Sequence, residues 1–137
     1  MIGLVLVGHS AEVVSGVRAM VRQAAPRVPV EGAGGLSGGR LGTSGIDVAS
    51  ALRRALDAAG GDSLIVLLDL GSAGLAIDIA LDELGDNDRA RVRVSEAPFV
   101  EGAVLAGVAI AGGASIDGVV AAAEAAARTP KLLRDGG

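Results

Sequence analysis

Short apolar runs alternate with amphipathic segments along this chain, and the alternation predicts repeated strand–loop–helix units. Near-continuous apolar runs at residues 2–7 and 63–71 are typical of parallel strands that are buried on both faces. A short run at 28–31 and an alternating run at 92–95 complete a predicted set of four strands. Because the run at 92–95 is less apolar and alternates, we expect that strand at an edge of the sheet.

Apolar residues at helical spacing predict helices at residues 11–25, 46–59, 73–84 and 116–128. In the first helix we expect a buried stripe of Val13, Val17, Met20, Val21 and Ala24. In the second we expect the same role for Val48, Leu52, Ala55, Leu56 and Ala59. Residues 85–89 are interpreted as a turn, and the stretch at 96–115 is given no element, although its small residues at 104–113 would permit close helix packing.

This order of elements predicts an α/β fold with a mostly parallel four-stranded sheet. We expect the strand order 2-1-3-4, in which the first and third strands are neighbours. Right-handed crossovers place helices on both faces of such a sheet. No segment resembles a linker, so we expect one domain over residues 1–128 and a flexible C-terminal tail over residues 129–137.

Composition and charge exclude several classes of function. The formal net charge is −4 and no basic cluster stands out, which argues against nucleic-acid and membrane-surface partners. The absence of cysteine excludes disulfides and thiolate metal sites, and a single histidine argues against a metal centre. With no targeting segment and no long apolar span, we expect a soluble cytoplasmic protein. We also expect that it needs no cofactor.

Two chemically capable side chains follow predicted neighbouring strands. His9, the only histidine, comes just after the first strand, and Asp69 ends the third. Sites in open parallel sheets form beyond the carboxyl ends of the strands, where the strand order reverses, so we expect the two residues in one crevice. A carboxylate on one ring nitrogen would leave the other free for nucleophilic attack. The alternative for each residue is a purely structural role as a turn or cap.

Glycine-rich turns surround this predicted crevice. "GTSG" opens the second helix and "GSAG" the third, and backbone N–H groups at such helix starts suit an oxyanion such as phosphate. Gly8 is expected to leave room for that phosphate beside the ring. The alternative is that these are ordinary capped helix starts. The candidate phosphate-binding residues are Ser10, Gly42, Thr43, Ser44, Gly71 and Ser72.

Other catalytic and nucleotide motifs do not fit. "GGLSGGRL" places Arg40 and Leu41 where a Walker loop requires Lys and Ser or Thr, and "GAGG" lacks the spacing of a dinucleotide fingerprint. No G-x-S-x-G elbow supports a serine hydrolase. We therefore expect no tightly bound nucleotide in this chain.

Four motifs in order carry a family resemblance over about residues 1–128. "LVLVGHS", the loop ending in "GTSG", "VLLDLGSAG" and "APFVEGAV" resemble the phosphotransfer subunit of phosphoenolpyruvate-dependent dihydroxyacetone kinase. That family is similar to the mannose-type IIA domains of the sugar phosphotransferase system. Mannose-type sugar domains usually have Gly-Gly-Ser-Pro near this aspartate. The segment Leu70-Gly71-Ser72-Ala73 lies closer to the dihydroxyacetone branch.

The resemblance implies a phosphotransferase subunit. His9 would accept a phosphoryl group from the phosphocarrier HPr and donate it to ADP on the ADP-binding subunit of the kinase. Asp69 would be the matching family carboxylate that orients His9. The family is usually homodimeric, and some members continue into HPr-like and enzyme I-like domains. Because this chain stops before such domains, we expect separate carriers. The ring nitrogen that is phosphorylated stays open at this point.

Two other functions remain as alternatives. A IIA domain that serves a mannose-type sugar transporter would share the fold and chemistry and differ in its acceptor. A non-catalytic α/β binding module would use His9 only as a strand-end residue. A response-regulator receiver fits less well, since the only lysine, Lys131, lies in the tail. Partner docking would need an exposed rim near His9, for which Leu36 and Leu41 are candidates, whereas we expect Phe99 to be an internal anchor.

Overall fold

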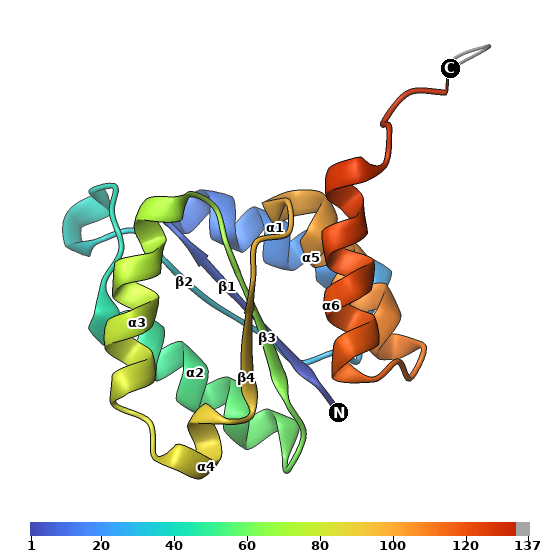
Figure 1. The fold of residues 1–137 in the computed structure, drawn as a ribbon. Helices are drawn as coiled ribbons and strands as arrows, with labels where there is room; N and C mark the ends of the chain where they lie inside the picture. Colours follow the sequence, from blue (N-terminus) through green and yellow to red (C-terminus); the bar gives the residue numbers. More distant parts are fainter. Residues whose placement is uncertain (134–137) are drawn as a thin grey trace.

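A computed structural model describes residues 1–133 and shows a parallel sheet in the order β2-β1-β3-β4 (Figure 1). This confirms the predicted fold and strand order, with β2 and β4 at the edges. In the two central pairings, Val7 of β1 lies opposite Ala33 of β2 and Leu68 of β3. The strands are β1 (Gly3–Gly8), β2 (Val30–Gly34), β3 (Leu64–Leu68) and β4 (Val92–Ser95).

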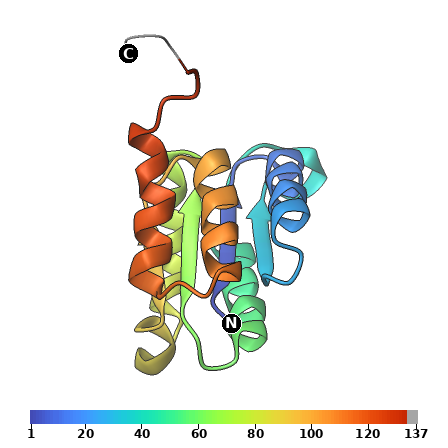
Figure 2. The ribbon, with the colours of Figure 1, turned by 90° about the vertical axis from the view of Figure 1, so that its right-hand side faces the viewer.

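Helices cover both faces of the sheet, as Figures 1 and 2 show from two directions. One face packs against α2 (Gly45–Ala59) and α3 (Gly74–Asp82), and α4 (Asp86–Arg89) leads from α3 into β4. The other face packs against α1 (Ala11–Ala24), α5 (Phe99–Ala111) and α6 (Ile116–Ala125). Three short 3₁₀ turns complete the elements: η1 (Ser37–Gly39), η2 (Gly71–Ala73) and η3 (Ala126–Arg128).

The central strands are buried on both faces, as their continuous apolar runs predict. In β1, Val5 and Val7 face α2 and α3, whereas Leu4 and Leu6 face α1 and α5. Strand side chains alternate between faces, so one strand supplies both halves of the core. The predicted stripe of α2 is confirmed, because all five of its residues are buried.

The predicted stripe of α1 is partly wrong. Val13 and Met20 are 48% and 50% exposed, and Ala24 is also exposed. The buried face instead runs through Val14, Val17 and Val21. The i, i+3, i+7 spacing holds in both sets, and the helix is rotated so that the neighbouring row of apolar residues meets the sheet.

Several boundaries also differ from the prediction. The second strand begins at Val30 rather than residue 28, the expected turn at residues 85–89 contains the short helix α4, and residues 126–128 form η3 rather than the end of α6. Within residues 96–115, for which the apolar pattern predicts no element, α5 forms. This helix lacks a clear polar face because it packs between α1, α6 and the sheet. Its small residues do permit close packing: a Cβ on Gly107 would come within 2.8 Å of Val21 Cγ1.

Residues 129–133 of the predicted tail form neither helix nor strand, and residues 134–137 lie outside the described residues. In the part of the chain that the structure describes, no helix combines the length and apolar character required to cross a membrane.

Candidate functional site

His9 and Asp69 meet at the carboxyl edge of the sheet. β1 and β3 are neighbouring parallel strands, and the pairing of Val7 with Leu68 makes them end side by side. His9 follows β1 directly and Asp69 follows β3 directly. The ring Nδ1 of His9 lies 2.9 Å from Asp69 Oδ1, and the backbone N–H of His9 donates to Asp69 Oδ2, also at 2.9 Å. The structure therefore brings together the two residues that strand-end reasoning selected.

The Asp69 carboxylate is held by donors on both oxygens. Besides its two bonds to His9, it accepts a 2.7 Å hydrogen bond from the backbone N–H of Leu70. Partial burial alone would raise the pKa of Asp69, but the hydrogen bonds from His9 and Leu70 outweigh that effect and hold this pKa below its ordinary value. Asp69 is therefore ionised at neutral pH and acts only as an acceptor.

This carboxylate fixes the chemistry of the imidazole ring. Because ionised Asp69 can only accept, the neutral ring carries its proton on Nδ1 and keeps a lone pair on Nε2. The hydroxyl of Ser72, in η2, lies 3.0 Å from Nε2 and can donate to that lone pair. Because Nδ1 is bonded to Asp69, Nε2 is the ring nitrogen that is free for a reaction, and the side chain is 25% exposed.

Gly8 makes room for the carboxylate rather than for a phosphate. A Cβ at residue 8 would lie 2.8 Å from Val14 Cγ2 and 3.2 Å from Asp69 Oδ2. The space beside the backbone is therefore already filled by Asp69 and by the first turns of α1. This corrects the expectation that the glycine leaves space for the transferred group.

The predicted phosphate-binding residues divide into two groups. Ser10 and Ser44 are N-caps, since their hydroxyl oxygens accept hydrogen bonds from backbone N–H groups in the first turns of α1 and α2. The N–H of Gly42 donates to the carbonyl of His9 at 2.9 Å and so fastens its loop to the site. These three residues thus have structural roles, and their contact with a phosphate stays a prediction.

The second group lies in η2, next to the ring. Ser72 contacts Nε2 directly, and the N–H groups of Gly71 and Ser72 lie in the first turn of η2, where a helix offers no carbonyl of its own. Both residues are exposed. Thr43 is half-buried beside the N-cap of α2. The Leu70 N–H is a further partner of Asp69 that the sequence does not predict, because a backbone donor leaves no residue-type signal.

The rim around the site is apolar and exposed. Leu41 is 74% exposed, and Leu70, directly after Asp69, is 59% exposed. Leu36 is half-buried and covers Gly42, where a Cβ would lie 2.7 Å from Leu36 Cδ1. Phe99 is half-buried against the core cluster of α1, α5 and α6, as expected for an internal anchor.

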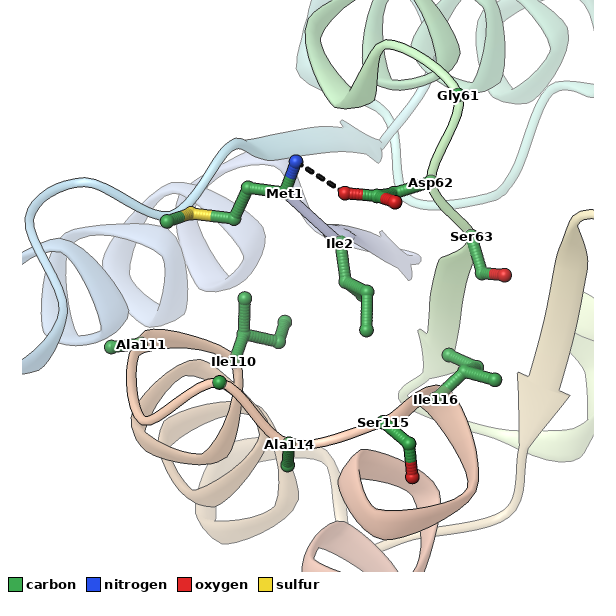
Figure 3. Close-up of a pocket in the computed structure, with 11 residues that line it drawn as sticks. Met1, Ile2, Gly61, Asp62, Ser63, Ile110, Ala111, Ala114, Ser115 and Ile116 are labelled. Atoms are coloured by element: carbon green, nitrogen blue, oxygen red, sulfur yellow. Dashed lines mark ion pairs between the residues drawn. The ribbon is translucent and has the colours of Figure 1, made fainter.

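A separate cavity of about 530 Å³ lies at the opposite end of the sheet. It opens between the start of β1, the turn before β3 and the α5–α6 connection, where Ile2, Ile110 and Ile116 line it (Figure 3). At its edge the amino group of Met1 pairs with Asp62. None of the candidate site residues lines this cavity. Within residues 1–133, no three histidine or carboxylate side chains lie together as a metal site would require.

Comparison with known proteins gives consistent matches. The family EIIA-man, described as the fructose IIA component of the phosphotransferase system (PTS), matches residues 3–120. A phosphoryl donor subunit DhaM of PEP-dependent dihydroxyacetone kinase from Klebsiella michiganensis is 38% identical over 124 residues, which cover 88% of this chain and 26% of that protein. The chain therefore spans about a quarter of that relative.

Two further proteins match nearly end to end. A phosphotransferase subunit DhaM of PTS-dependent dihydroxyacetone kinase from Lactococcus lactis is 30% identical over 117 residues, covering 85% of this chain and 89% of that protein. A crystal structure described as the unknown function protein EF1359 superposes with a TM-score of 0.82 at 26% identity and covers 97% of this chain and 98% of that one.

Proposed function

We propose that this chain, which belongs to the EIIA-man family, is the phosphohistidine carrier of a PEP-dependent dihydroxyacetone kinase. The observation that carries the proposal is the ring of His9. Its Nδ1 is bonded to Asp69, its Nε2 faces the hydroxyl of Ser72, and the side chain as a whole is partly exposed. The relatives that are named as DhaM subunits support dihydroxyacetone kinase as the system served.

In the first step, Nε2 attacks the phosphorus of a phosphohistidine on HPr. The new Nε2–P bond forms as the N–P bond of the donor breaks, and the donor's ring takes back the electron pair. The His9 ring becomes positively charged, because Nδ1 keeps its proton. Asp69, ionised and 2.9 Å from Nδ1, stabilises that charge without taking the proton.

In the second step, an oxygen of the terminal phosphate of ADP attacks the same phosphorus. The Nε2–P bond breaks, its electron pair returns to Nε2, and the ring becomes neutral again. No proton leaves Nδ1 in either direction, so the site returns to its starting state after each cycle. In this scheme the protein contributes alignment and charge stabilisation, which is what phosphoryl transfer requires.

The groups around Nε2 suit the oxygens of the phosphoryl group. The Ser72 hydroxyl can turn from Nε2 to a phosphoryl oxygen, and the N–H groups of Gly71 and Ser72 lie in the same turn. Ser10, Thr43 and Ser44 are proposed to complete this ring of donors. The exposed rim of Leu41 and Leu70 offers an apolar surface to protein partners. A homodimer remains a prediction from the family resemblance, and a cytoplasmic location remains a prediction from the sequence.

A IIA domain that serves a sugar transporter is the second candidate. The matching family is described as a fructose IIA component, and such a domain would use the same site. The two functions differ only in the acceptor. Relatives at 30% and 38% identity that are named as dihydroxyacetone kinase subunits favour the first.

Phosphorylation from purified components tests the proposal. The chain is incubated with phosphoenolpyruvate, enzyme I and HPr, and we expect one acid-labile, base-stable adduct per chain, which ³¹P NMR assigns to Nε2. His9→Ala, with its fold checked by circular dichroism, should give no adduct. ADP and the ADP-binding kinase subunit are then added, and the label should pass to ATP. A wild-type chain without an adduct contradicts both candidates, and an adduct that ADP does not discharge contradicts the first.

A further inference from the structure

The glycine-rich loop between β2 and α2 (Figure 1, cyan segment) is a constrained structure that carries one arginine, Arg40. Its backbone closes on itself, since the N–H of Leu36 donates to the carbonyl of Arg40 at 2.8 Å. The guanidinium Nε of Arg40 adds a hydrogen bond to the carbonyl of Ser37 at 3.3 Å. Gly35, Gly38, Gly39 and Gly42 all have positive φ, a conformation that other residues adopt at a cost.

This loop is attached to the residues that flank the reactive histidine. The N–H of Gly42 donates to the His9 carbonyl, and Gly34 pairs with Gly8 in the sheet. The loop also lies against the start of α1, where a Cβ on Gly35 would come within 3.1 Å of the backbone nitrogen of Ala11. The loop is therefore tied to the turn that presents His9, and Arg40 lies two residues from the point of attachment.

Arg40 has no counterpart among the segments that follow the strands. In residues 8–15, 34–47, 69–78 and 95–102, it is the only arginine or lysine. Among the described residues beyond these segments, Arg18 and Arg54 line a hollow with Ala11 and Gly34, but Arg18 donates to the Val30 carbonyl and Arg54 pairs with Glu31. Lys131 pairs with Glu101. A phosphorylated His9 would place a doubly charged group next to ionised Asp69. The site thus concentrates negative charge and has a single basic side chain in the loops around it.

We propose that the Arg40 guanidinium binds the phosphoryl group while it is on His9 and during its transfer. This inference rests on the proposed function. The side chain is exposed, and within residues 1–133 its guanidinium makes one hydrogen bond, from Nε, so both terminal nitrogens are available. Their planar, paired N–H groups match two phosphoryl oxygens. Arg40 forms and breaks no bond; it neutralises charge on the oxygens as the phosphorus moves between Nε2 and its partner.

A small-molecule donor tests this inference without any partner protein. Phosphoramidate should transfer its phosphoryl group to Nε2 of His9 with loss of ammonia, and ³¹P NMR then follows the titration of the bound group. Arg40→Gln should load His9 more slowly, by roughly 10- to 100-fold for the loss of one charge-assisted contact. It should also raise the pKa of the bound phosphoryl group, because the nearby positive charge is removed. Arg40→Lys should restore part of both effects.

Arg27→Gln is the matched control. Arg27 is exposed and precedes β2, at the opposite end of the sheet. The substitution therefore removes the same positive charge at a position far from the site. Its loading rate and phosphoryl titration should equal those of the wild type. Equal loading and an unchanged phosphoryl pKa in Arg40→Gln would overturn the inference. The inference would also be overturned if Arg40→Gln slowed only the transfer from HPr, with unchanged loading by phosphoramidate and an unchanged phosphoryl pKa. That result would mean that Arg40 contacts the partner protein instead of the phosphoryl group. A wild type that phosphoramidate loads but HPr does not would instead overturn the proposed function.

Discussion

Replacing Asp69 by asparagine separates the charge of this side chain from its shape. Asparagine keeps the volume of the residue but turns one oxygen into an NH₂ group. If the amide oxygen takes the place of Oδ1, the NH₂ group faces the N–H of His9. If it takes the place of Oδ2, the NH₂ group faces the N–H of Leu70 and also Nδ1. Either way, one backbone donor loses its acceptor and faces another donor.

The size of both effects follows from these contacts. A donor left without an acceptor in a partly buried site costs roughly 1–3 kcal/mol, so Asp69→Asn should unfold at a melting temperature lower by about 3–10 °C. Transfer should slow by roughly 10- to 100-fold, because the positive ring of phosphorylated His9 loses one charge-assisted hydrogen bond. In the second orientation the NH₂ group also forces the ring proton onto Nε2, which removes the attacking lone pair.

A single histidine makes the assay direct. ¹⁵N NMR of the imidazole reports the tautomer of His9 without overlap from other residues, and transfer from phosphorylated HPr gives the rate. The wild type should show the proton on Nδ1, and the variant should show a larger population with the proton on Nε2. An Asp69→Asn chain with the wild-type tautomer and the wild-type rate would refute the role given to the carboxylate.

The pH dependence of stability gives a second readout of the same substitution. The pKa of Asp69 is lower in the folded protein than in the unfolded chain, so its carboxylate stabilises the fold above the unfolded pKa, about 4. That stabilisation is lost as the pH falls through the folded pKa. The difference in unfolding free energy between wild type and Asp69→Asn should therefore be constant at neutral pH and shrink below about pH 4. A difference that stays constant to pH 2 would contradict the lowered pKa.

Two further predictions concern other positions. Gly8→Ala should place a methyl group against Val14 and Asp69 and cost roughly 1–3 kcal/mol of stability, with slower phosphorylation because the carboxylate is displaced; an unaltered melting temperature would contradict this packing. The guanidinium of Arg91 donates to the carbonyls of Leu56, Gly60 and Asp62. Arg91→Ala should therefore lower the free energy of unfolding in urea by roughly 1–3 kcal/mol and leave the loading rate of His9 unchanged. A stability equal to that of the wild type would contradict these hydrogen bonds.

The sequence was sufficient to place His9 and Asp69 together because both depend on topology alone. Continuous apolar runs identify central parallel strands, and parallel neighbours end at the same edge. Once β1 and β3 are neighbours, residues directly after each strand must be close. The finer arrangement was beyond this reasoning. The space that Gly8 provides for a carboxylate depends on the path of α1, which no local pattern encodes.

The errors in the predicted elements have a common origin in tertiary packing. In α1 two overlapping rows of apolar residues satisfy helical spacing, and only contact with the sheet selects Val14 over Val13. In α5 the helix contacts neighbours on several sides, so the amphipathic signal that identifies helices is absent. Periodicity alone predicts helices that lie on a surface better than those enclosed by other helices.

The way Asp69 is bonded also bears on why a phosphohistidine here would persist until an acceptor arrives. A nearby carboxylate promotes hydrolysis of a phosphohistidine when the carboxylate acts as a general base toward a water molecule. This role requires a carboxylate oxygen that is free and sufficiently basic. Both oxygens of Asp69 instead accept hydrogen bonds from His9, and one accepts a further bond from Leu70. The same bonds lower its pKa and so weaken it as a base. The arrangement that makes Nε2 a nucleophile thus also restrains the Asp69 carboxylate beside the ring from activating water, which suits a carrier rather than a phosphatase.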